Sequence, residues 1–344
     1  MIIDRRYTSG RIAVANLSAS IESLELRRID ATFRNLVALS KLLFLRGDLR
    51  GRIVDHDRAE LVANEAIALS ADTASGLYIR AQLAERFHRF AEANTLLDQA
   101  LAAGHPGPEI DVERAALLQA TGQYKEALSV RERLLANDAP SIQTLGSLAT
   151  LLAEMDQWST AEGCYIAALE ADEGTSPIPA GQLLFEWGVS AMRRGDLDRA
   201  EEIFVQLDAI LPQHVPGRGH RAEVALARGQ LDFAEALVTP LLAIADDPEY
   251  RATYAEIVAA RGDDKAAVIE AERAAAAYER LLARRPEAYA DHAAAFFISI
   301  GNQPQRAVDL ALANFKLRDT PRSRKLLQRA LQKTQQLSVS QEAA

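Results

Sequence analysis

Cysteine is almost absent from this sequence, because Cys164 is the one cysteine among 344 residues. A disulfide framework within the chain and a cysteine-based zinc site are therefore excluded. Long apolar runs are missing as well, since no stretch approaches the ~18 consecutive apolar residues that a membrane-spanning helix needs. The first residues do not form an apolar run after a basic start, as a secretion signal would. We therefore expect a soluble protein of a reducing compartment, the cytoplasm.

Aromatic side chains are also scarce, at 6% of the residues, whereas apolar residues make up 49% and alanine is abundant among them. Small apolar side chains suit helices that pack closely together. The net charge of −9 disfavours nonspecific binding to nucleic acid or to an anionic membrane. The composition therefore predicts neither a nucleic-acid partner nor a membrane span.

Sequence motifs for catalysis and nucleotide binding are missing: GxxxxGK[ST], GxSxG, HExxH and GxGxxG. Among the six histidines, His214 and His220 are neighbours in the sequence, but their spacing across an expected loop is not a recognised metal-ligand pattern. We interpret Cys164 as a buried, unreactive thiol on a helix. The prediction is that the chain is not an enzyme and has no catalytic residues, no metal site and no cofactor.

What the sequence does contain is an alanine that returns at regular intervals, within similar phrases such as YKEAL and LDRAE. The first four of these alanines are each 34 residues apart, and the later intervals are 39, 34, 33 and 40 residues. A repeat of this length is typical of helical solenoids. We place each alanine early in the second helix of a unit, where a larger side chain would push two helices apart. The series consists of Ala59, Ala93, Ala127, Ala161, Ala200, Ala234, Ala267 and Ala307.

Glycine and proline mark the boundaries of the units. Glycine suits a helix end because it adopts a positive φ without a clash of a Cβ atom. Proline cannot continue a helix and therefore marks the loops between units. Each unit is predicted to contain a helix, a tight turn, a second helix and a short loop. The turn glycines are Gly122, Gly195, Gly229, Gly262 and Gly301, and the loop prolines are Pro106, Pro140, Pro212, Pro248 and Pro286.

These features resemble those of tetratricopeptide repeat (TPR) proteins. The unit at residues 181–214 matches best, although Leu207 stands where the family has a second small residue. The resemblance covers residues 40–322 and implies an all-α, right-handed superhelical solenoid of about eight helix pairs. The matching residues of the best unit are Leu184, Trp187, Gly188, Gly195, Asp196, Leu197, Ala200, Phe204 and Pro212.

The array is expected to have additional helices at both ends. Residues 1–39 form an N-terminal segment, irregular up to residue 15, with one helix near 16–28 and a second that Asp30 or Thr32 caps. Residues 319–337 form an amphipathic capping helix, and residues 338–344 a disordered tail. The units of the array are placed near residues 40–73, 74–107, 108–141, 142–175, 181–214, 215–247, 248–287 and 288–318.

In the family the first helices line a concave groove, and the resemblance carries that role to particular residues. The set has mixed charge and a few aromatic side chains, which suits a peptide partner. It lacks the lysines and asparagines with which some family members hold a terminal carboxylate. The candidate groove residues are Arg46, Arg52, Tyr78, Arg80, Gln82, Glu85, Arg86, Arg114, Gln143, Glu154, Gln182, Phe185 and Arg193, with Asp48, Gln119, Thr150, Glu223, Glu256, Tyr289 and His292 as further positions.

Arginine occupies one first-helix position at which the family prefers leucine. Arg46, Arg80 and Arg114 are each 34 residues apart, and Arg221 repeats the position later. One interpretation is that each arginine pairs with a nearby carboxylate of the chain. The other is that the series faces the groove and binds an acidic peptide or another polyanion.

The segment 315–334 is strongly basic, since Asp319 is its one acidic residue. Such a segment is typical of the solvated face of a capping helix. It also suits an anionic partner, such as an acidic surface of another subunit. Its basic residues are Lys316, Arg318, Arg322, Arg324, Lys325, Arg329 and Lys333.

The function that these features favour is a non-catalytic scaffold, which binds a protein or peptide segment in the concave groove. An acidic partner is one candidate. A second hypothesis is a regulatory or sensor module that binds a signalling peptide or a small ligand. A third is an enzyme or its accessory domain, for which the sequence offers no polar cluster. Homo-oligomers through exposed solenoid ends remain compatible with all three.

Overall fold

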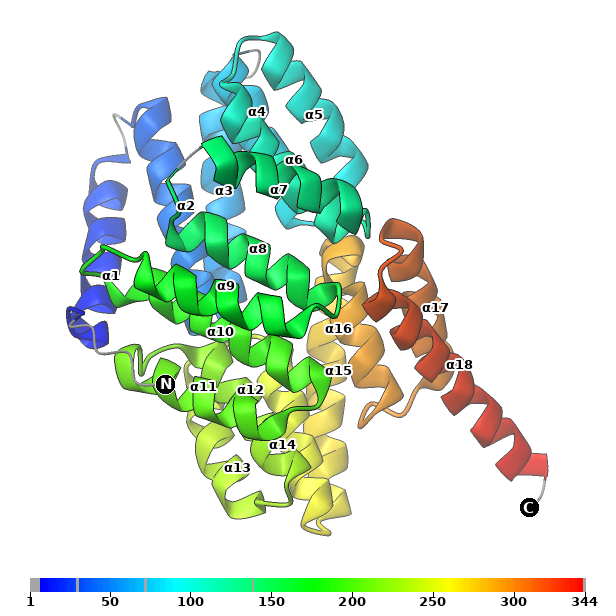
Figure 1. Cartoon of the computed structure of the whole chain (residues 1–344). Helices are drawn as coiled ribbons and strands as arrows, with labels where there is room; N and C mark the ends of the chain where they lie inside the picture. The colour runs from blue at the N-terminus through cyan, green and yellow to red at the C-terminus, as the bar shows by residue number, and fades with distance from the viewer. Residues whose placement is uncertain (1–6, 29–30, 71–72, 138, 343–344) are drawn as a thin grey trace.

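The computed structural model describes residues 7–28, 31–70, 73–137 and 139–342. These residues form an all-α solenoid of eighteen α-helices and one short 3₁₀ helix, η2 (Thr239–Ala243). The α-helices pack in consecutive pairs along the chain (Figure 1). The expected fold class, a TPR-like solenoid, is confirmed.

Eight helix pairs follow an initial helix, α1 (Gly10–Leu26), and a final helix, α18 (Pro321–Glu342), follows them. The turns within the pairs are short, as the glycines of the sequence predict. The pairs are α2 (Phe33–Arg50) with α3 (Ile53–Leu69), α4 (Ala74–Arg86) with α5 (Phe90–Ala102), α6 (Gly107–Ala120) with α7 (Tyr124–Asn137), α8 (Ile142–Glu154) with α9 (Trp158–Glu170), α10 (Pro177–Arg194) with α11 (Leu197–Ile210), α12 (Val215–Ala227) with α13 (Leu231–Val238), α14 (Pro248–Ala260) with α15 (Asp264–Arg284), and α16 (Pro286–Ile298) with α17 (Pro304–Leu317).

The recurring alanines are buried between the paired helices. Seven of the eight have no exposed surface, and Ala267 is 3% exposed. Each lies near the beginning of the second helix of its pair, as expected. Because interiors are close-packed, these positions leave no room for a longer side chain.

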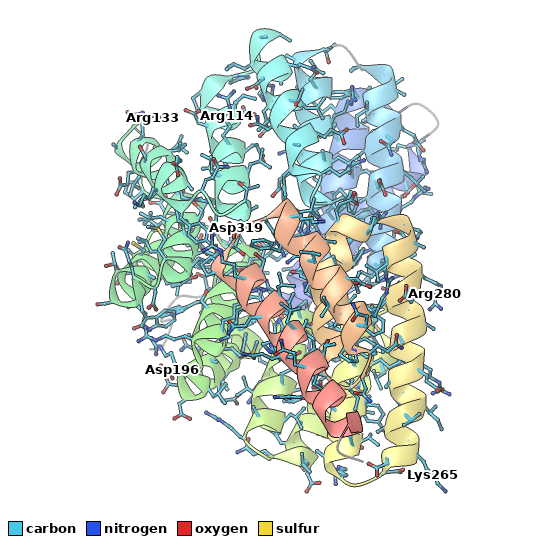
Figure 2. The ribbon with its side chains drawn as sticks, turned by 90° about the vertical axis from the view of Figure 1, so that its right-hand side faces the viewer. Arg114, Arg133, Asp196, Lys265, Arg280 and Asp319 are labelled. Atoms are coloured by element: carbon cyan, nitrogen blue, oxygen red, sulfur yellow. The ribbon has the colours of Figure 1, made fainter. Side chains whose placement is uncertain are left out.

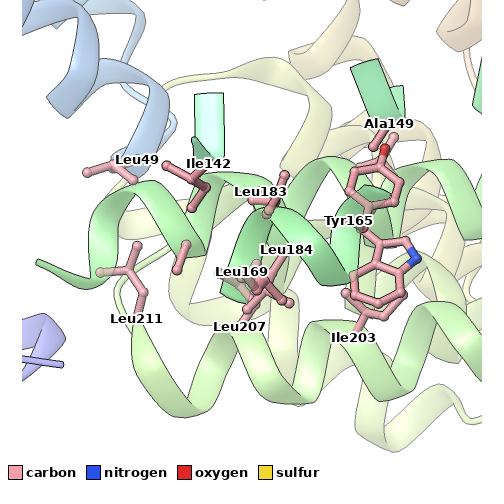
Figure 3. Packing of buried hydrophobic residues seen from close by; sticks show 14 of the residues in the cluster. Leu49, Ile142, Ala149, Tyr165, Leu169, Leu183, Leu184, Ile203, Leu207 and Leu211 are labelled. Carbon is pink, nitrogen blue, oxygen red and sulfur yellow. The ribbon is translucent and has the colours of Figure 1, made fainter. Parts of the chain in front are cut away.

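Larger side chains fill the space within the pairs and between neighbouring pairs. In the middle of the chain, Leu183 and Leu184 of α10 lie near Leu207 and Leu211 of α11 (Figure 3). The ring of Tyr165 stacks on that of Trp187, with their centroids 5.2 Å apart. This packing between neighbours continues from repeat to repeat, so that stability is shared along the array.

The superhelix closes on itself, because the segment before α14 caps the beginning of α3. The carboxylate of Asp246 accepts hydrogen bonds from the backbone N–H groups of Ile53 (2.5 Å) and Val54 (3.1 Å). The N–H of Asp246 in turn donates to the carbonyl of Gly51 at 3.2 Å. A carboxylate at a helix N-terminus satisfies otherwise unpaired donors and interacts favourably with the helix dipole. The seventh repeat is thereby joined to the first.

Ion pairs at the end of α15 strengthen this closure. The guanidinium of Arg285 bonds to Asp57 at 2.6 Å and to Glu60, both on α3. Arg284 also bonds to Asp57, at 2.8 Å. The guanidinium of Arg285 lies 4.3 Å from the centre of the Phe87 ring, which adds a cation–π contact.

Two glycines permit the close approach of distant segments. A Cβ atom on Gly51, whose φ is +60°, would lie 2.6 Å from the hydroxyl oxygen of Tyr250. A Cβ atom on Gly122, whose φ is +85°, would lie 2.3 Å from the carbonyl oxygen of Asp319. The first contact joins repeats one and seven, and the second joins repeat three to the turn before α18.

The irregular intervals of the repeat fit these long-range contacts. The helix α15 has 21 residues, and its additional length carries Arg284 and Arg285 to α3. The 39-residue interval contains the loop before α10, where Asp172 accepts a hydrogen bond of 3.0 Å from the hydroxyl of Tyr7. The longer units therefore provide the surfaces on which other parts of the chain pack.

Both ends of the chain differ from expectation. The first helix begins at Gly10 instead of residue 16, because Val14, Leu17 and Ile21 form one buried stripe. The last helix continues to Glu342, so residues 338–342, expected to be disordered, are helical because the sequence has no glycine or proline to end the helix.

The N-cap of α2 is one of the two residues that the sequence predicts. Thr32 caps α2 by accepting a hydrogen bond from the N–H of Asn35, as expected, and its alternative Asp30 lies outside the described residues. Within the described part of the chain, no helix is long and apolar enough to cross a membrane.

The close crossing at the repeated alanine is tested by Ala127→Asp. We expect this change to lower the free energy of unfolding by at least about 3 kcal/mol, because it combines overpacking with an unpaired buried charge. The matched control is Ser129→Asp on the exposed face of the same helix, which should cost less than about 1 kcal/mol. Urea unfolding followed by circular dichroism measures both, and equal stabilities would show that the helix register is wrong.

The closure is tested by Arg285→Met. Its side chain is 10% exposed, and its loss leaves Glu60 without this partner and Asp57 with Arg284 alone, so we expect a cost of about 2–3 kcal/mol. Arg306→Met is the control, because its pair with Glu279 is largely exposed and does not join distant repeats. That control should cost less than about 1 kcal/mol. Thermal unfolding measures the melting temperature of each variant. An equal decrease in Arg285→Met and Arg306→Met would argue against a role of the ion pair in closure.

Candidate functional site: the central cavity

The closed superhelix surrounds a cavity of about 1180 Å³. Its wall consists mainly of the first helices of successive pairs, α4, α6, α8, α10 and α16, and α18 adds a further side. In Figure 2, α18 begins near Asp319 and runs diagonally across the lower half of the molecule, on the side that faces the viewer. The concave face is therefore lined as the resemblance implied, but part of the chain itself covers it.

The cavity contains only part of the expected groove. The candidate groove residues that line the cavity come from the second, fourth and fifth helix pairs. Four of the further groove positions named from the sequence also line the cavity. Those from the candidate set are Glu85, Arg86, Glu154 and Arg193, and those from the further positions are Gln119, Thr150, Tyr289 and His292.

Other candidates form contacts away from this cavity. Tyr78 and Gln82 both donate hydrogen bonds to Oε1 of Glu113, at 3.0 and 2.7 Å. Phe185 packs against histidine rings, with its centroid 4.9 Å from that of His214. Gln143 and Gln182 are exposed.

The periodic arginines mostly pair with carboxylates. Arg46 forms two hydrogen bonds with Asp55, at 2.7 and 2.8 Å, and Arg52 lies 3.4 Å from the same carboxylate. Arg114 pairs with Asp98. Arg221 pairs with Glu201 at 2.7 Å. None of these arginines, nor Arg80, is among the residues that line the cavity.

A basic cluster dominates one side of the cavity. We define it as Arg193 and Arg194 of α10 together with Arg318, Arg322, Lys325 and Arg329, which lie before and along α18. Although the Arg193 side chain reaches solvent, desolvation by the surrounding protein, and then the charge of Arg322, lower its pKa. Cations from two distant parts of the sequence thus lie close enough to repel one another, which an anion between them would relieve.

Carboxylates of the cavity balance only part of this charge. Asp291 is 3% exposed and bonds to Arg318, and it lies 3.7 Å from Arg322. Desolvation by the surrounding protein raises the pKa of Glu186, whose side chain still reaches solvent, although Arg193 opposes that rise. The side chains of Arg193, Arg322, Lys325 and Arg329 are exposed, so solvent reaches this side of the cavity.

Across the cavity, Arg86 belongs to a compact polar group. One of its nitrogens lies 3.0 Å from Asp48, which also contacts Nε2 of His56 at 3.0 Å. Burial opposes the charge of Asp48, but the hydrogen bonds from His56 and Arg86 lower its pKa. The Arg86 guanidinium lies 4.8 Å from the centre of the Phe44 ring.

A second polar group lies on the first helices of later repeats. The ligand atoms of His220, Glu223 and Glu249 lie within 4.8 Å of one another, an arrangement that can hold a metal ion. The sequence interpretation weighed His220 together with His214, but His214 is buried and its Nδ1 accepts the N–H of Gly217, which caps α12. The spacing of His220 and Glu223, one turn apart on a helix, is the signal that could have indicated this group.

The comparisons with known proteins agree with this architecture. Residues 191–257 match the tetratricopeptide repeat family. The crystal structure of the APC/C hetero-tetramer Cut9–Hcn1 has a similar fold, with a TM-score of 0.50 and 13% identity over 86% of this chain and 55% of that one.

This chain contains tetratricopeptide repeats.

Two further proteins share part of their sequence or their fold with this chain. Protein NPGR2 of Arabidopsis thaliana is 28% identical to this chain over 198 residues. The match covers 50% of this chain and 26% of NPGR2. The chain thus spans about a quarter of the length of this curated relative. A tetratricopeptide repeat protein from Parabacteroides merdae gives a TM-score of 0.47 at 19% identity, covering 70% of this chain and 91% of that one.

The family relation bears on the general role of the TPR protein. Tetratricopeptide repeats generally serve as protein-interaction modules, and they are typically non-catalytic. Protein partners are therefore implied.

The thiol of Cys164 is half-buried, and burial raises its pKa, which lowers its reactivity at neutral pH.

The raised pKa of Glu85, a carboxyl group in the wall of the cavity, predicts a pH dependence of stability. Burial, and then the charge of Glu113, raise the pKa of Glu85 to about 7 from its ordinary 4.5. A carboxyl group whose pKa is raised by folding destabilises the protein as it ionises, so stability should fall as pH rises from about 5 to 8.

The variant Glu85→Gln should remove part of this pH dependence. We expect it to be more stable than the wild type at pH 8 by about 1–2 kcal/mol, after allowance for water in the cavity, and nearly equal at pH 5. Urea unfolding at both values measures this, with Glu126→Gln on the exposed face of α7 as control. A pH profile that is identical for wild type and Glu85→Gln would contradict the assignment.

Proposed function

We propose that this TPR protein is a non-catalytic scaffold that binds an acidic segment of a partner protein in its central cavity. The observation that carries the proposal is the basic cluster, whose exposed side chains line the cavity. The family relation supports the general role, since tetratricopeptide repeats generally bind proteins.

The charge of the cavity favours an acidic occupant. Of the six cations in the basic cluster, Arg318 pairs closely with Asp291, whereas Arg322 is only 3.7 Å from it. Arg194 stacks over Trp158, with 5.2 Å between the guanidinium and the ring centre. Arginine donates to carboxylates in a fixed, two-pronged geometry, and a neighbouring indole can pack against an apolar side chain of the segment.

The size of the cavity favours a peptide. Its volume of about 1180 Å³ exceeds the ~300–1,000 Å³ that is common for sites of small ligands. The lining residues come from many helices, so an extended segment contacts several repeats at once. Such a surface gives specificity through a few well-placed side chains.

A smaller pocket supports the alternative of a regulatory module for a small ligand. It has a volume of about 300 Å³ and lies between α2 and α4, where Phe44, Gln82 and Arg86 line it. Arg86 lines both spaces, so a ligand in this pocket would contact the wall of the central cavity.

The proposal predicts the effect of reversing charge in the basic cluster. Fluorescein-labelled peptides of twelve residues, either rich in Glu and Asp or with the same apolar residues and Lys instead, are titrated with the protein. The acidic set should bind more tightly, and Arg322→Glu/Lys325→Glu should weaken that binding at least tenfold, as measured by fluorescence anisotropy. Binding should also weaken as salt is raised.

The control variant carries the same change in net charge elsewhere. Arg27→Glu/Lys265→Glu changes two exposed cations on α15 and at the end of α1, and it should leave peptide binding within twofold. An equal loss of affinity for the acidic peptide in both variants would show that net charge alone determines binding, and it would contradict the proposal. Loss with Arg86→Met but not with Arg322→Glu/Lys325→Glu would favour the smaller pocket instead.

A further inference from the structure

We propose that His220, Glu223, Glu249 and His292 form a binding site for a divalent transition-metal cation, with Zn²⁺ as the best match. This site is separate from the basic cluster and does not depend on the binding of a peptide. It would join three successive repeats, because the residues belong to α12, α14 and α16.

The core of the site is a histidine–carboxylate pair on one helix. His220 and Glu223 are one turn apart on α12, and Nδ1 of His220 lies 2.9 Å from Oε2 of Glu223. Glu249, near the beginning of α14, places Oε1 4.0 Å from the same nitrogen. All three ligand atoms lie within 4.8 Å of one another.

A fourth ligand comes from the next repeat. Nδ1 of His292 on α16 lies 3.7 Å from Oε2 of Glu249. The His292 side chain is 44% exposed, so it can rotate toward a cation without displacing the core. The four residues therefore offer two imidazole nitrogens and two carboxylates.

The distances suit a small cation. Zn²⁺ binds nitrogen and oxygen ligands at about 2.0–2.2 Å, which places the donors of a tetrahedral site about 3.3 Å apart. The separations of 2.9 and 4.0 Å around Nδ1 of His220 lie on either side of this value. We expect the side chains of Glu249 and His292 to rotate toward a bound cation, because the donors of Glu249 lie 4.0 Å from His220 and 3.7 Å from His292.

The surroundings hold two of the ligands in position. The ring of His220 packs beside those of Phe185 and Phe204, with centroids 5.6 and 6.4 Å away, which restricts its rotation. The hydroxyl of Thr253 lies 3.4 Å from Oε1 of Glu223, the oxygen that faces away from His220. Outer contacts of this kind orient metal ligands in known sites.

The donor set selects the class of cation. Mg²⁺ and Ca²⁺ prefer oxygen ligands, whereas two imidazoles with two carboxylates suit zinc and neighbouring transition metals. The two carboxylates also supply negative charge that offsets the charge of a divalent ion. The bound ion would tie α12, α14 and α16 together at the wall of the cavity, to which His292 contributes.

Zinc binding to the full-length chain tests the proposal. Competition with a chromophoric zinc chelator should show one Zn²⁺ per chain with a Kd of about 1 µM or tighter. Bound zinc should also raise the melting temperature, because it binds the folded state alone. Substituted Co²⁺ should give the visible absorption bands of a four-coordinate nitrogen and oxygen site.

Single variants identify the ligands. Glu249→Gln and His292→Gln should each weaken zinc binding at least tenfold, while circular dichroism shows that the fold is retained. The control is Glu109→Gln, because Glu109 also faces a histidine, with 3.1 Å between its Oε2 and Nε2 of His105, but on another part of the array. That variant should bind zinc like the wild type.

Three results would overturn the proposal. The first is a wild-type chain that binds zinc no more tightly than about 100 µM. The second is an equal loss of affinity in Glu109→Gln and Glu249→Gln, and the third is an unchanged affinity in both site variants. If Glu249→Gln fails to fold, the exposed residue His292 and the Co²⁺ spectrum decide the question.

Discussion

The contact between the end of α15 and the beginning of α3 is the constraint on which the rest of this structure depends. Arg285 bonds to Asp57 and Glu60, and Asp246 caps α3 at the same junction. In a solenoid each repeat contacts mainly its neighbours, so a bond between the first and seventh repeats changes the character of the whole array. It converts a curved surface into the wall of a cavity.

Closure also explains why the site combines residues from distant parts of the sequence. Arg193 belongs to the fifth pair and Arg322 to the final helix, yet the charge of one lowers the pKa of the other. In an open superhelix these cations would face solvent separately. Brought together at a side of the cavity that solvent reaches, they form the basic cluster on which the proposal of an anionic partner rests.

Much of the fold follows from local features that repeat. A small residue such as Ala127 is needed wherever two helices cross closely, and Gly122 is needed where the chain turns with a positive φ, so both recur in the sequence. The helix pairs could therefore be predicted, together with inward-facing residues such as Glu85 and Arg193. The prediction of the helix pairs rests on periodicity, whereas the inward-facing positions are those that the family resemblance implies.

The remaining features depend on how small rotations between repeats add up. Asp57 and Arg285 are separated by most of the array, and no local pattern says that they meet. The same holds for Glu223, Glu249 and His292, which approach one another only because three first helices stack side by side. Arg46 and Arg114 were candidates by their spacing, but spacing does not reveal that Asp55 and Asp98 lie beside them.

The closed form of the superhelix can be measured directly by electron spin resonance. Spin labels are attached to cysteines that replace Leu61 of α3 and Ala283 of α15, both exposed, in a chain that carries Cys164→Ser. If the first and seventh repeats are joined, the distance between the labels will have one narrow and short distribution in solution. A broad distribution centred at long distances would contradict the closed superhelix and, with it, the cavity.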